Sequence, residues 1–124
     1  MLFRSNAGRA YADQYHWLRA LTDARSELER RFLDRVYATH RRLPDDAQKQ
    51  LADYYAQPDF FYEPNVCVFC DGSVHDQPQQ RVTDETVRRE LKAKGYRVIV
   101  IRYDQNLEEQ IKRHGDIFGQ GINV

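Results

Sequence analysis

The sequence predicts an α/β fold in which helices flank a mixed β-sheet. Two short runs of aromatic and β-branched residues, Phe60–Tyr62 and Val66–Cys70, are separated by the turn residues Glu63-Pro64-Asn65, a pattern typical of a β-hairpin. A helical pattern follows, and then an apolar run at 96–103. A strand–helix–strand crossover places its two strands parallel in one sheet. We therefore expect antiparallel and parallel pairs in the same sheet.

Two helices are expected before the hairpin. The first runs from Gly8 to about Thr22, where aromatic and leucine side chains recur at helical spacing. The second runs from about 27 to 39, because Ser26 stands three residues before Glu29 in the capping-box arrangement and an apolar stripe follows. Glu29 borders the inward face of this helix, and its simplest role is that of the capping glutamate.

The segment 49–56 fits two patterns. Leu51 would suit a helix begun by Pro44, whereas the tyrosines 54 and 55 ahead of Pro58 would suit a strand. We favour a strand, because an isolated hairpin is marginally stable and a third strand makes a three-stranded antiparallel meander. Residues 43–48 are then expected to form a turn or a single helical turn.

The crossover helix is expected to follow a polar loop at 76–80. Thr83 is its predicted N-cap, and Gly95 is its predicted C-terminal stop. The run at 96–103 is apolar at successive positions, which is typical of a strand buried within a sheet. We expect this strand to lie parallel to residues 65–71.

The C-terminal segment is expected to add one more helix. Asp104 is its predicted cap, and Glu108 is predicted to pair with Lys112 on the outer side. The last residues, 116–119, are expected to dock as a tail.

Composition limits the class of protein. A chain of 124 residues is long enough for one domain, and its 19 basic and 19 acidic side chains give no net charge that would predict a nucleic-acid partner. Residues 1–43 nevertheless carry nine arginines and five acidic residues, a net of +4. No apolar run is long enough to span a bilayer and no signal-peptide pattern is present, so we expect a soluble, cytoplasmic protein without a membrane partner.

Cys67 and Cys70 form a C-x-x-C pair, a spacing found in zinc and redox sites. Within a strand, however, positions three apart point to opposite faces. The sequence also has no second cysteine pair to complete a zinc site. We therefore expect two buried strand thiols in a reducing compartment.

The length of the hairpin turn decides whether two acids share a face of the sheet. With a three-residue turn, Asp59 faces Phe69, and Asp59 and Asp71 become diagonal neighbours roughly 7–8 Å apart at the backbone. Two carboxylates at that separation can hold one Mg2+, which prefers oxygen ligands. A two-residue turn would place Cys70 opposite Asp59 and turn Asp71 away.

Four groups of residues together carry a resemblance to a known superfamily. They are Pro58-Asp59-Phe60, the run Cys70-Asp71-Gly72-Ser73-Val74-His75, Asp84 with Arg88 and Leu91, and the run from Gly95 to Ile99. This set resembles the restriction-endonuclease-like PD-(D/E)xK superfamily, and within it the branch of the very-short-patch mismatch-repair endonucleases. It is also similar to the domain at the C-terminal end of some large bacterial DEAD/DEAH-type helicases. The resemblance spans residues 26–118, so we expect a helical extension at 1–24 and an endonuclease-like domain at 25–124.

The resemblance implies a DNA endonuclease that hydrolyses phosphodiesters with Mg2+ or Mn2+. It implies DNA as the substrate, with a helicase or a subunit of a defence complex as a possible partner. The expected catalytic residues are Asp59, Asp71, His75 and Glu29, and the expected supporting residues are Asp84 and Arg88. In this assignment Asp59 and Asp71 hold the metal, His75 lies near the attacking water or the scissile phosphate, and Glu29 helps to organise the site.

Two departures from the superfamily pattern open alternatives. Phe69 stands two residues before Asp71, where many relatives carry an acid, and no lysine occupies the third position of the core motif. The mismatch-repair branch works without that lysine, using histidine and a main-chain carbonyl, here that of Cys70. Phe69 favours a catalytically inactive nuclease-like module that binds DNA or a partner protein, and the zero net charge favours an interaction domain that binds no nucleic acid.

Overall fold

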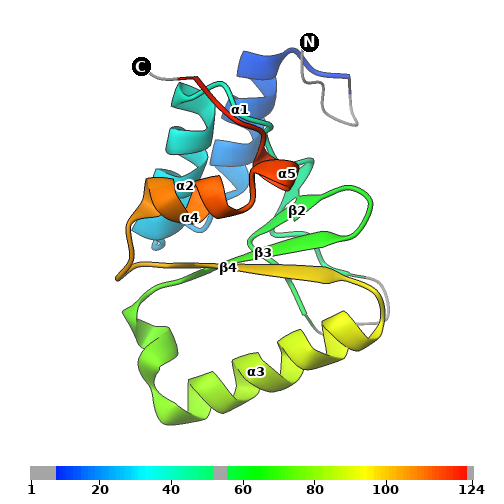
Figure 1. Cartoon of the computed structure of the whole chain (residues 1–124), viewed down its shortest axis with the longest axis vertical. Helices are drawn as coiled ribbons and strands as arrows, with labels where there is room; N and C mark the ends of the chain where they lie inside the picture. The colour runs from blue at the N-terminus through cyan, green and yellow to red at the C-terminus, as the bar shows by residue number, and fades with distance from the viewer. Residues whose placement is uncertain (1–7, 52–55, 123–124) are drawn as a thin grey trace.

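The computed structural model describes residues 8–51 and 56–122. They form a four-stranded sheet in the order β1-β2-β3-β4 with helices on both faces (Figure 1). The pairs β1–β2 and β2–β3 are antiparallel and the pair β3–β4 is parallel. The predicted α/β architecture, with three antiparallel strands and one parallel strand, is confirmed.

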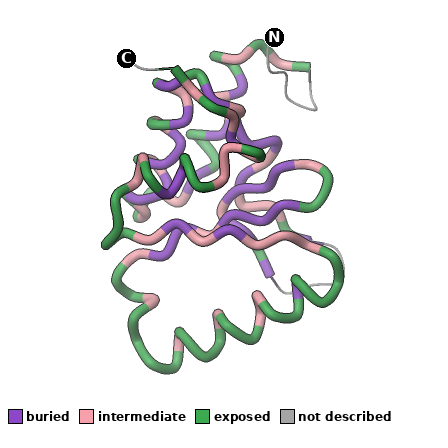
Figure 2. Tube along the Cα trace, in the orientation of Figure 1, coloured by how far each residue is buried: buried purple, intermediate pink, exposed green. Residues whose placement is uncertain are grey.

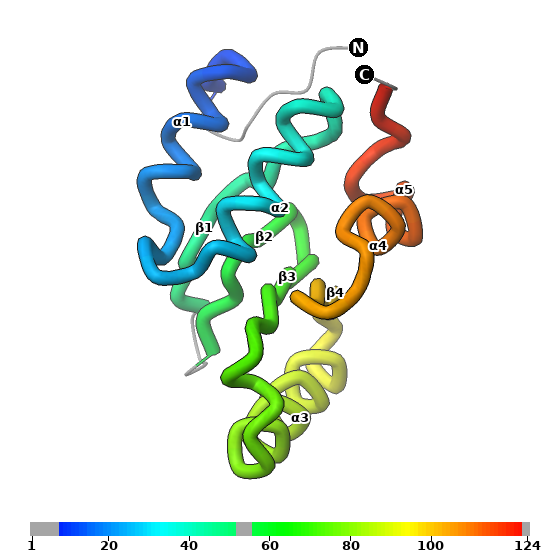
Figure 3. Tube along the Cα trace, turned by 90° about the vertical axis from the view of Figure 1, so that its left-hand side faces the viewer, coloured from blue at the N-terminus to red at the C-terminus, as the bar shows by residue number. Residues whose placement is uncertain are grey.

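The elements occupy most of the described chain. In order they are α1 (Tyr11–Leu21), α2 (Glu27–Ala38), β1 (Asp46–Ala47), β2 (Phe60–Tyr62), β3 (Val66–Asp71), the 3-10 helix η1 (Ser73–Asp76), α3 (Pro78–Ala93), β4 (Arg97–Arg102), α4 (Leu107–Arg113) and α5 (Gly115–Phe118). The helices α1, α2, α4 and α5 lie on one side of the sheet and α3 lies on the other, which the side view in Figure 3 also shows. Within the described ranges, no helix has both the length and the apolar character needed to cross a membrane.

The hairpin has the predicted three-residue turn. Tyr62 pairs with Val66 and Phe60 pairs with Val68, which places residues 63–65 in the turn. β2 is antiparallel to β3, so the residue before β2 and the last residue of β3 lie at the same end of the sheet.

The first strand of the meander is β1, not the predicted segment 49–56. Backbone hydrogen bonds from Asp45 N to Phe61 O (2.8 Å) and from Gln48 N to Asp59 O (3.0 Å) flank the pairing of β1 with β2. Residues 49–51 and 56 belong to no strand, and 52–55 lie outside the described residues. The prediction of a turn at 43–48 was also wrong, because residues 46 and 47 form β1. These two residues have no strand pattern of their own and form a strand only by pairing with β2.

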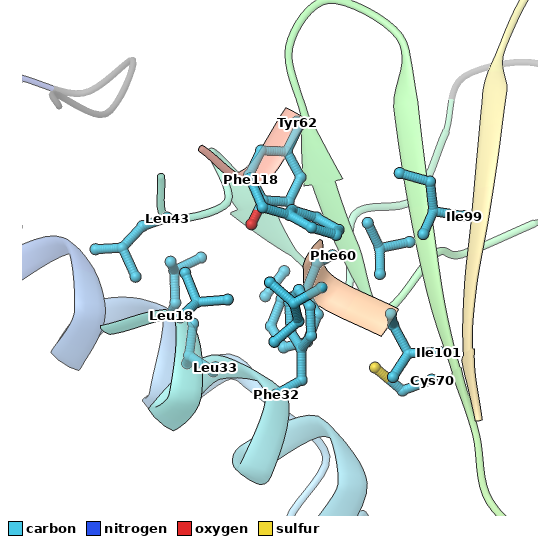
Figure 4. Close-up of a cluster of buried hydrophobic side chains, with 14 of the residues drawn as sticks. Leu18, Phe32, Leu33, Leu43, Phe60, Tyr62, Cys70, Ile99, Ile101 and Phe118 are labelled. Atoms are coloured by element: carbon cyan, nitrogen blue, oxygen red, sulfur yellow. The ribbon is translucent and has the colours of Figure 1, made fainter. Parts of the chain in front are cut away.

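The larger core lies between the sheet and the helices α1, α2, α4 and α5 (Figure 4). Leu18 of α1 is fully buried in it, so the predicted extension 1–24 shares a core with the rest of the chain. Phe118 is also fully buried, with its ring 5.4 Å from those of Phe32 and Tyr62. The expected docking of the C-terminal tail is confirmed, although the tail is a short helix.

A smaller core fills the space between the sheet and α3. Its buried residues include Leu91 of α3 and Cys67 of β3, whereas Cys70 belongs to the larger core on the other face. Both cysteines are free and buried, as predicted. Burial raises the pKa of the Cys67 thiol to about 11 and that of Cys70 well above its usual value, so neither is a ready nucleophile or metal ligand.

β4 is parallel to β3, as expected, with Arg97 opposite Val66. It stands at one end of the strand order, however, rather than inside the sheet. Its apolar residues face both ways because helices cover both faces: Ile99 and Ile101 enter the larger core, and Val98 packs against the smaller one.

Helix α3 begins at Pro78, five residues before the predicted cap Thr83. Proline is favourable at the first position of a helix, because it has no N–H to satisfy and its φ is already helical. The Thr83 hydroxyl instead donates to Gln79 O (3.1 Å) within the helix. The expected stop is correct, since Gly95 has a φ of 96°. Much of the outward surface of α3 is exposed (Figure 2).

The predicted cap and ion pair of the last long helix were wrong. Asn106 caps α4 by accepting from Glu109 N (2.9 Å), while Asp104 pairs with Arg102. Glu108 pairs with Arg41 (2.7 Å) and Arg35 (2.8 Å) rather than with Lys112. These contacts join α4 to α2 and to the segment after it, and contacts between separate elements cannot be read from spacing within one helix.

Candidate functional site

Acidic side chains meet at one end of the sheet, where β2 begins and β3 ends. Asp59 directly precedes β2, and Asp71 is the last residue of β3. The Asp59 carboxylate accepts a hydrogen bond from Cys70 N (2.7 Å from Oδ2), which ties it to the neighbouring strand. The antiparallel pairing of β2 and β3 thus places Asp59 beside the carboxyl end of β3.

Glu29 and Asp59 both accept hydrogen bonds from the side-chain amide of Gln48. Gln48 Nε2 lies 2.7 Å from Glu29 Oε1 and 3.4 Å from Asp59 Oδ1. Ser26 Oγ accepts from Glu29 N (3.2 Å), so the predicted N-cap of α2 is confirmed. Glu29 is only 4% exposed, and its carboxylate also accepts from Asp23 N (3.4 Å). The expected capping-box contact of Glu29 is absent, because Ser26 N donates to Asp23 O and the Glu29 carboxylate instead meets Gln48 beside Asp59.

Both acids are electrostatically unfavourable as carboxylates. Burial and, to a lesser extent, the nearby charge of Asp59 together raise the pKa of Glu29 to about 7. Burial also raises the pKa of Asp59; the hydrogen bonds from Cys70 N and Gln48 oppose this effect, and the charge of Asp71 adds to it. A cation between Glu29 and Asp59 would offset both the burial and the repulsion.

A second group of polar side chains lies next to this pair. Arg88 donates to both oxygens of Asp71 (2.9 and 2.6 Å). His75 Nδ1 lies 2.7 Å from Asp84 Oδ2 and 3.7 Å from Asp71 Oδ1. Asp84 also accepts from Gln80 Nε2 (2.8 Å). The group is therefore a network in which each carboxylate oxygen of Asp71 and Asp84 accepts a hydrogen bond.

Three elements position this network. β3 ends with Asp71, η1 follows at once and carries His75, and α3 turns back over the sheet. Asp84 and Arg88 are four residues apart on α3 and therefore share one helix face. The ligand atoms of Asp71, His75 and Asp84 all lie within 4.8 Å of one another.

The two groups border one open cleft of about 760 Å³. Glu29, Asp59, His75, Asp84 and Arg88 all line it. Asp71 instead lines a smaller hollow of about 150 Å³, which His75, Asp84 and Arg88 also border. The structure thus brings the six sequence-predicted residues to one end of the sheet, with Asp59 nearest Glu29 and Asp71 held by Arg88.

The oxygen donors of the cleft fit a hard divalent cation such as Mg2+. Glu29 and Asp59 supply two carboxylates, which accept hydrogen bonds from backbone N–H groups and from the uncharged amide of Gln48. Asp71 fits less well, because both of its oxygens accept from Arg88. The use of Asp59 and Asp71 as joint metal ligands stays a prediction, and the geometry favours Glu29 as the partner of Asp59.

Two site residues were missed in the sequence. Gln80 lies four residues before Asp84, a spacing that becomes meaningful only if α3 starts before Thr83. Gln48 follows a two-residue strand and has no sequence signal, because its amide meets acids that lie 19 and 11 residues away.

The raised pKa of Glu29 predicts how stability changes with pH. The folded protein holds this proton more tightly than the unfolded chain, so the stabilisation is complete below pH 4.5 and is lost as pH rises to about 7. In the absence of divalent ions, we expect wild type to lose about 2 to 3 kcal/mol relative to Glu29→Gln over this range, since one pKa unit corresponds to about 1.4 kcal/mol. Urea unfolding below pH 4.5 and above pH 7 measures the difference.

The control for this experiment is Glu27→Gln, on the exposed side of the same helical turn. Its unfolding free energy should follow that of wild type at both pH values. Equal pH dependence of wild type and Glu29→Gln would contradict the burial of an acid with a raised pKa at this position.

The chain matches no protein-family model, no curated protein and no solved structure. The resemblance to the PD-(D/E)xK superfamily therefore stays a prediction.

Proposed function

We propose that this chain is a Mg2+-dependent DNA endonuclease with a restriction-endonuclease-like fold. The observation that carries the proposal is a single cleft lined both by an acid pair, the buried Glu29 and the half-buried Asp59, and by a histidine bound to a carboxylate, His75 with Asp84. Hydrolysis of a phosphodiester needs a site for a metal ion and a group that moves a proton. The cleft offers candidates for both.

The acid pair would hold the metal. Glu29 and Asp59 present carboxylate oxygens from α2 and from the start of β2, and Mn2+ suits the same oxygen ligands. A bound Mg2+ supplies activation of water and neutralises negative charge on the phosphate.

His75 would transfer the proton. Its Nδ1 contacts Asp84, which leaves Nε2 to exchange a proton in the cleft. As water attacks phosphorus and the bond to the leaving oxygen breaks, His75 accepts the water proton, and the leaving oxygen takes a proton from solvent. The carboxylate of Asp84, 2.7 Å from Nδ1, orients the ring.

Arginines at the cleft would contact the DNA backbone. Arg25 and Arg31 line the cleft, and the Arg25 side chain is 93% exposed. Both belong to the segment 1–43, whose net charge is +4. Phosphate contacts of this kind make binding weaken steeply as salt increases.

A cleavage assay tests the proposal. Supercoiled plasmid, single-stranded oligonucleotides, and matched and mismatched duplexes are incubated with the protein and Mg2+, Mn2+ or EDTA. We expect cleavage of at least one DNA form with either ion and none with EDTA. Cleavage that persists in EDTA, or its absence with both ions on every form, would reject the endonuclease proposal.

A second candidate is a catalytically inactive module that binds DNA, alone or with a helicase or defence-complex subunit. Two observations favour it: Phe69 takes the place of an acid, and Arg88 occupies both oxygens of Asp71 while stacking on the Phe69 ring (4.8 Å). Such a module would retard DNA in a gel in a strongly salt-dependent way without cutting it. A protein-interaction domain would do neither.

A further inference from the structure

Gln48 connects two acids that come from different parts of the fold. Its amide Nε2 lies 2.7 Å from Glu29 Oε1 on α2 and 3.4 Å from Asp59 Oδ1 ahead of β2. Gln48 itself follows β1. One side chain thus bridges the pair of carboxylates assigned to the metal.

The backbone at Gln48 is held in an unusual conformation. Its φ of 55° lies in the left-handed region, which residues other than glycine seldom adopt. Gln48 N donates to Asp59 O (3.0 Å), and Gln48 O accepts from Gln57 Nε2 (2.7 Å). Such conformations persist where the surrounding structure enforces them, and they gather at functional sites. Here the surrounding bonds aim the amide at the two acids.

We propose that Gln48 is a positioning residue that holds the Glu29 and Asp59 carboxylates at one spacing, so that they bind a divalent cation together. The inference rests on the proposed function, because it takes these two acids as the metal site. An amide suits the role because it donates hydrogen bonds to carboxylates without adding charge. A lysine or arginine in its place would neutralise the acids and compete with the cation.

Direct binding of Mn2+ tests this role without an activity assay. The loss of the electron-paramagnetic-resonance signal of free Mn2+ reports binding to the full chain in the absence of DNA. We expect Gln48→Met to weaken Mn2+ binding by about 10-fold to 100-fold, as the loss of hydrogen-bond partners of metal ligands does elsewhere. Methionine keeps the length of the side chain and removes the donor.

The matched control is Gln50→Met, in the same segment, whose amide donates to Ala56 O (3.5 Å). We expect it to bind Mn2+ like wild type. If Gln48→Met does not fold, Gln48→Asn serves as the test variant. Asparagine adopts the left-handed region more readily, but its side chain is one methylene too short for the amide to bridge both acids. Weakened binding by this folded variant would support the role.

Failure of this inference can be separated from failure of the proposed function. If wild type binds no Mn2+, or if Asp59→Asn binds it as wild type does, the proposed metal site is wrong. If Asp59→Asn loses binding while Gln48→Met and Gln48→Asn keep wild-type affinity, the positioning role is overturned and the metal site stands. Loss of binding in Asp59→Asn together with weakening in the Gln48 variants supports both.

Discussion

Replacing Asp59 with asparagine is expected to abolish Mg2+-dependent cleavage while the protein stays folded. The substitution removes the carboxylate that the proposed function assigns to the metal. Loss of a side chain that only hydrogen-bonds a metal ligand already lowers metal affinity or activity by up to about 100-fold. We therefore expect the loss of Asp59, a proposed ligand itself, to lower the cleavage rate by more than that. The initial rate of plasmid nicking in Mg2+ measures the effect.

Asparagine is a better test than alanine because of the bond to Cys70. The Asp59 carboxylate accepts from Cys70 N (2.7 Å), and the amide oxygen of asparagine can accept the same bond. Alanine would leave that N–H without its acceptor, at a cost of about 1–3 kcal/mol. Because asparagine also removes the repulsion between Asp59 and Glu29, we expect no loss of stability at neutral pH.

The control for Asp59→Asn is Asp46→Asn, at an acid of the neighbouring strand β1 that accepts a bond from Ala47 N (2.8 Å). This variant should cut DNA as wild type does. If Asp59→Asn also nicks plasmid at the wild-type rate, Asp59 is not a metal ligand and the acid pair has no catalytic role.

The hairpin and the crossover were predictable because their determinants are local. The turn at 63–65 sets the register of β2 and β3, and the apolar run at 97–102 marks a strand covered on both faces. β1 was not predictable, since two residues carry no periodicity and their pairing depends on a partner some 14 positions away along the chain. The start of α3 was missed because proline was taken as part of a loop rather than as the first helical residue.

The candidate site also combines features that local sequence signals predict with features that depend on tertiary packing. The register placed Asp59 and Asp71 at one end of the sheet, as expected, but side-chain partners depend on tertiary packing. Arg88 reaches Asp71 from α3, 17 residues away, and engages both of its oxygens. The sequence therefore indicates which acids gather, and the fold decides that Asp59 lies beside Glu29.

The second large effect is expected from Arg88→Met, which breaks the ion pair with Asp71. The Asp71 side chain is 5% exposed and that of Arg88 is 15% exposed, so the pair is largely shielded from water. Removing the guanidinium leaves a buried carboxylate without its two donors, and breaking such pairs costs about 3–5 kcal/mol. Urea unfolding at neutral pH measures this loss.

An exposed ion pair provides the comparison. Arg19 and Asp34 are joined at 2.9 Å, but their side chains are 41% and 43% exposed. Exposed pairs contribute about 0–1 kcal/mol, so Arg19→Met should change stability little. A similarly small effect of Arg88→Met would mean that water reaches the Asp71 carboxylate once the arginine is gone.

The double variant Asp71→Asn/Arg88→Met separates the two roles open to Asp71. If the carboxylate serves only to pair with Arg88, removing both charges leaves no uncompensated charge, and the double variant should recover much of the stability lost in Arg88→Met. Its Mn2+ affinity should then equal that of wild type, because Glu29 and Asp59 remain. Loss of Mn2+ binding in a stable double variant would instead return Asp71 to the metal site, as the sequence alone had predicted.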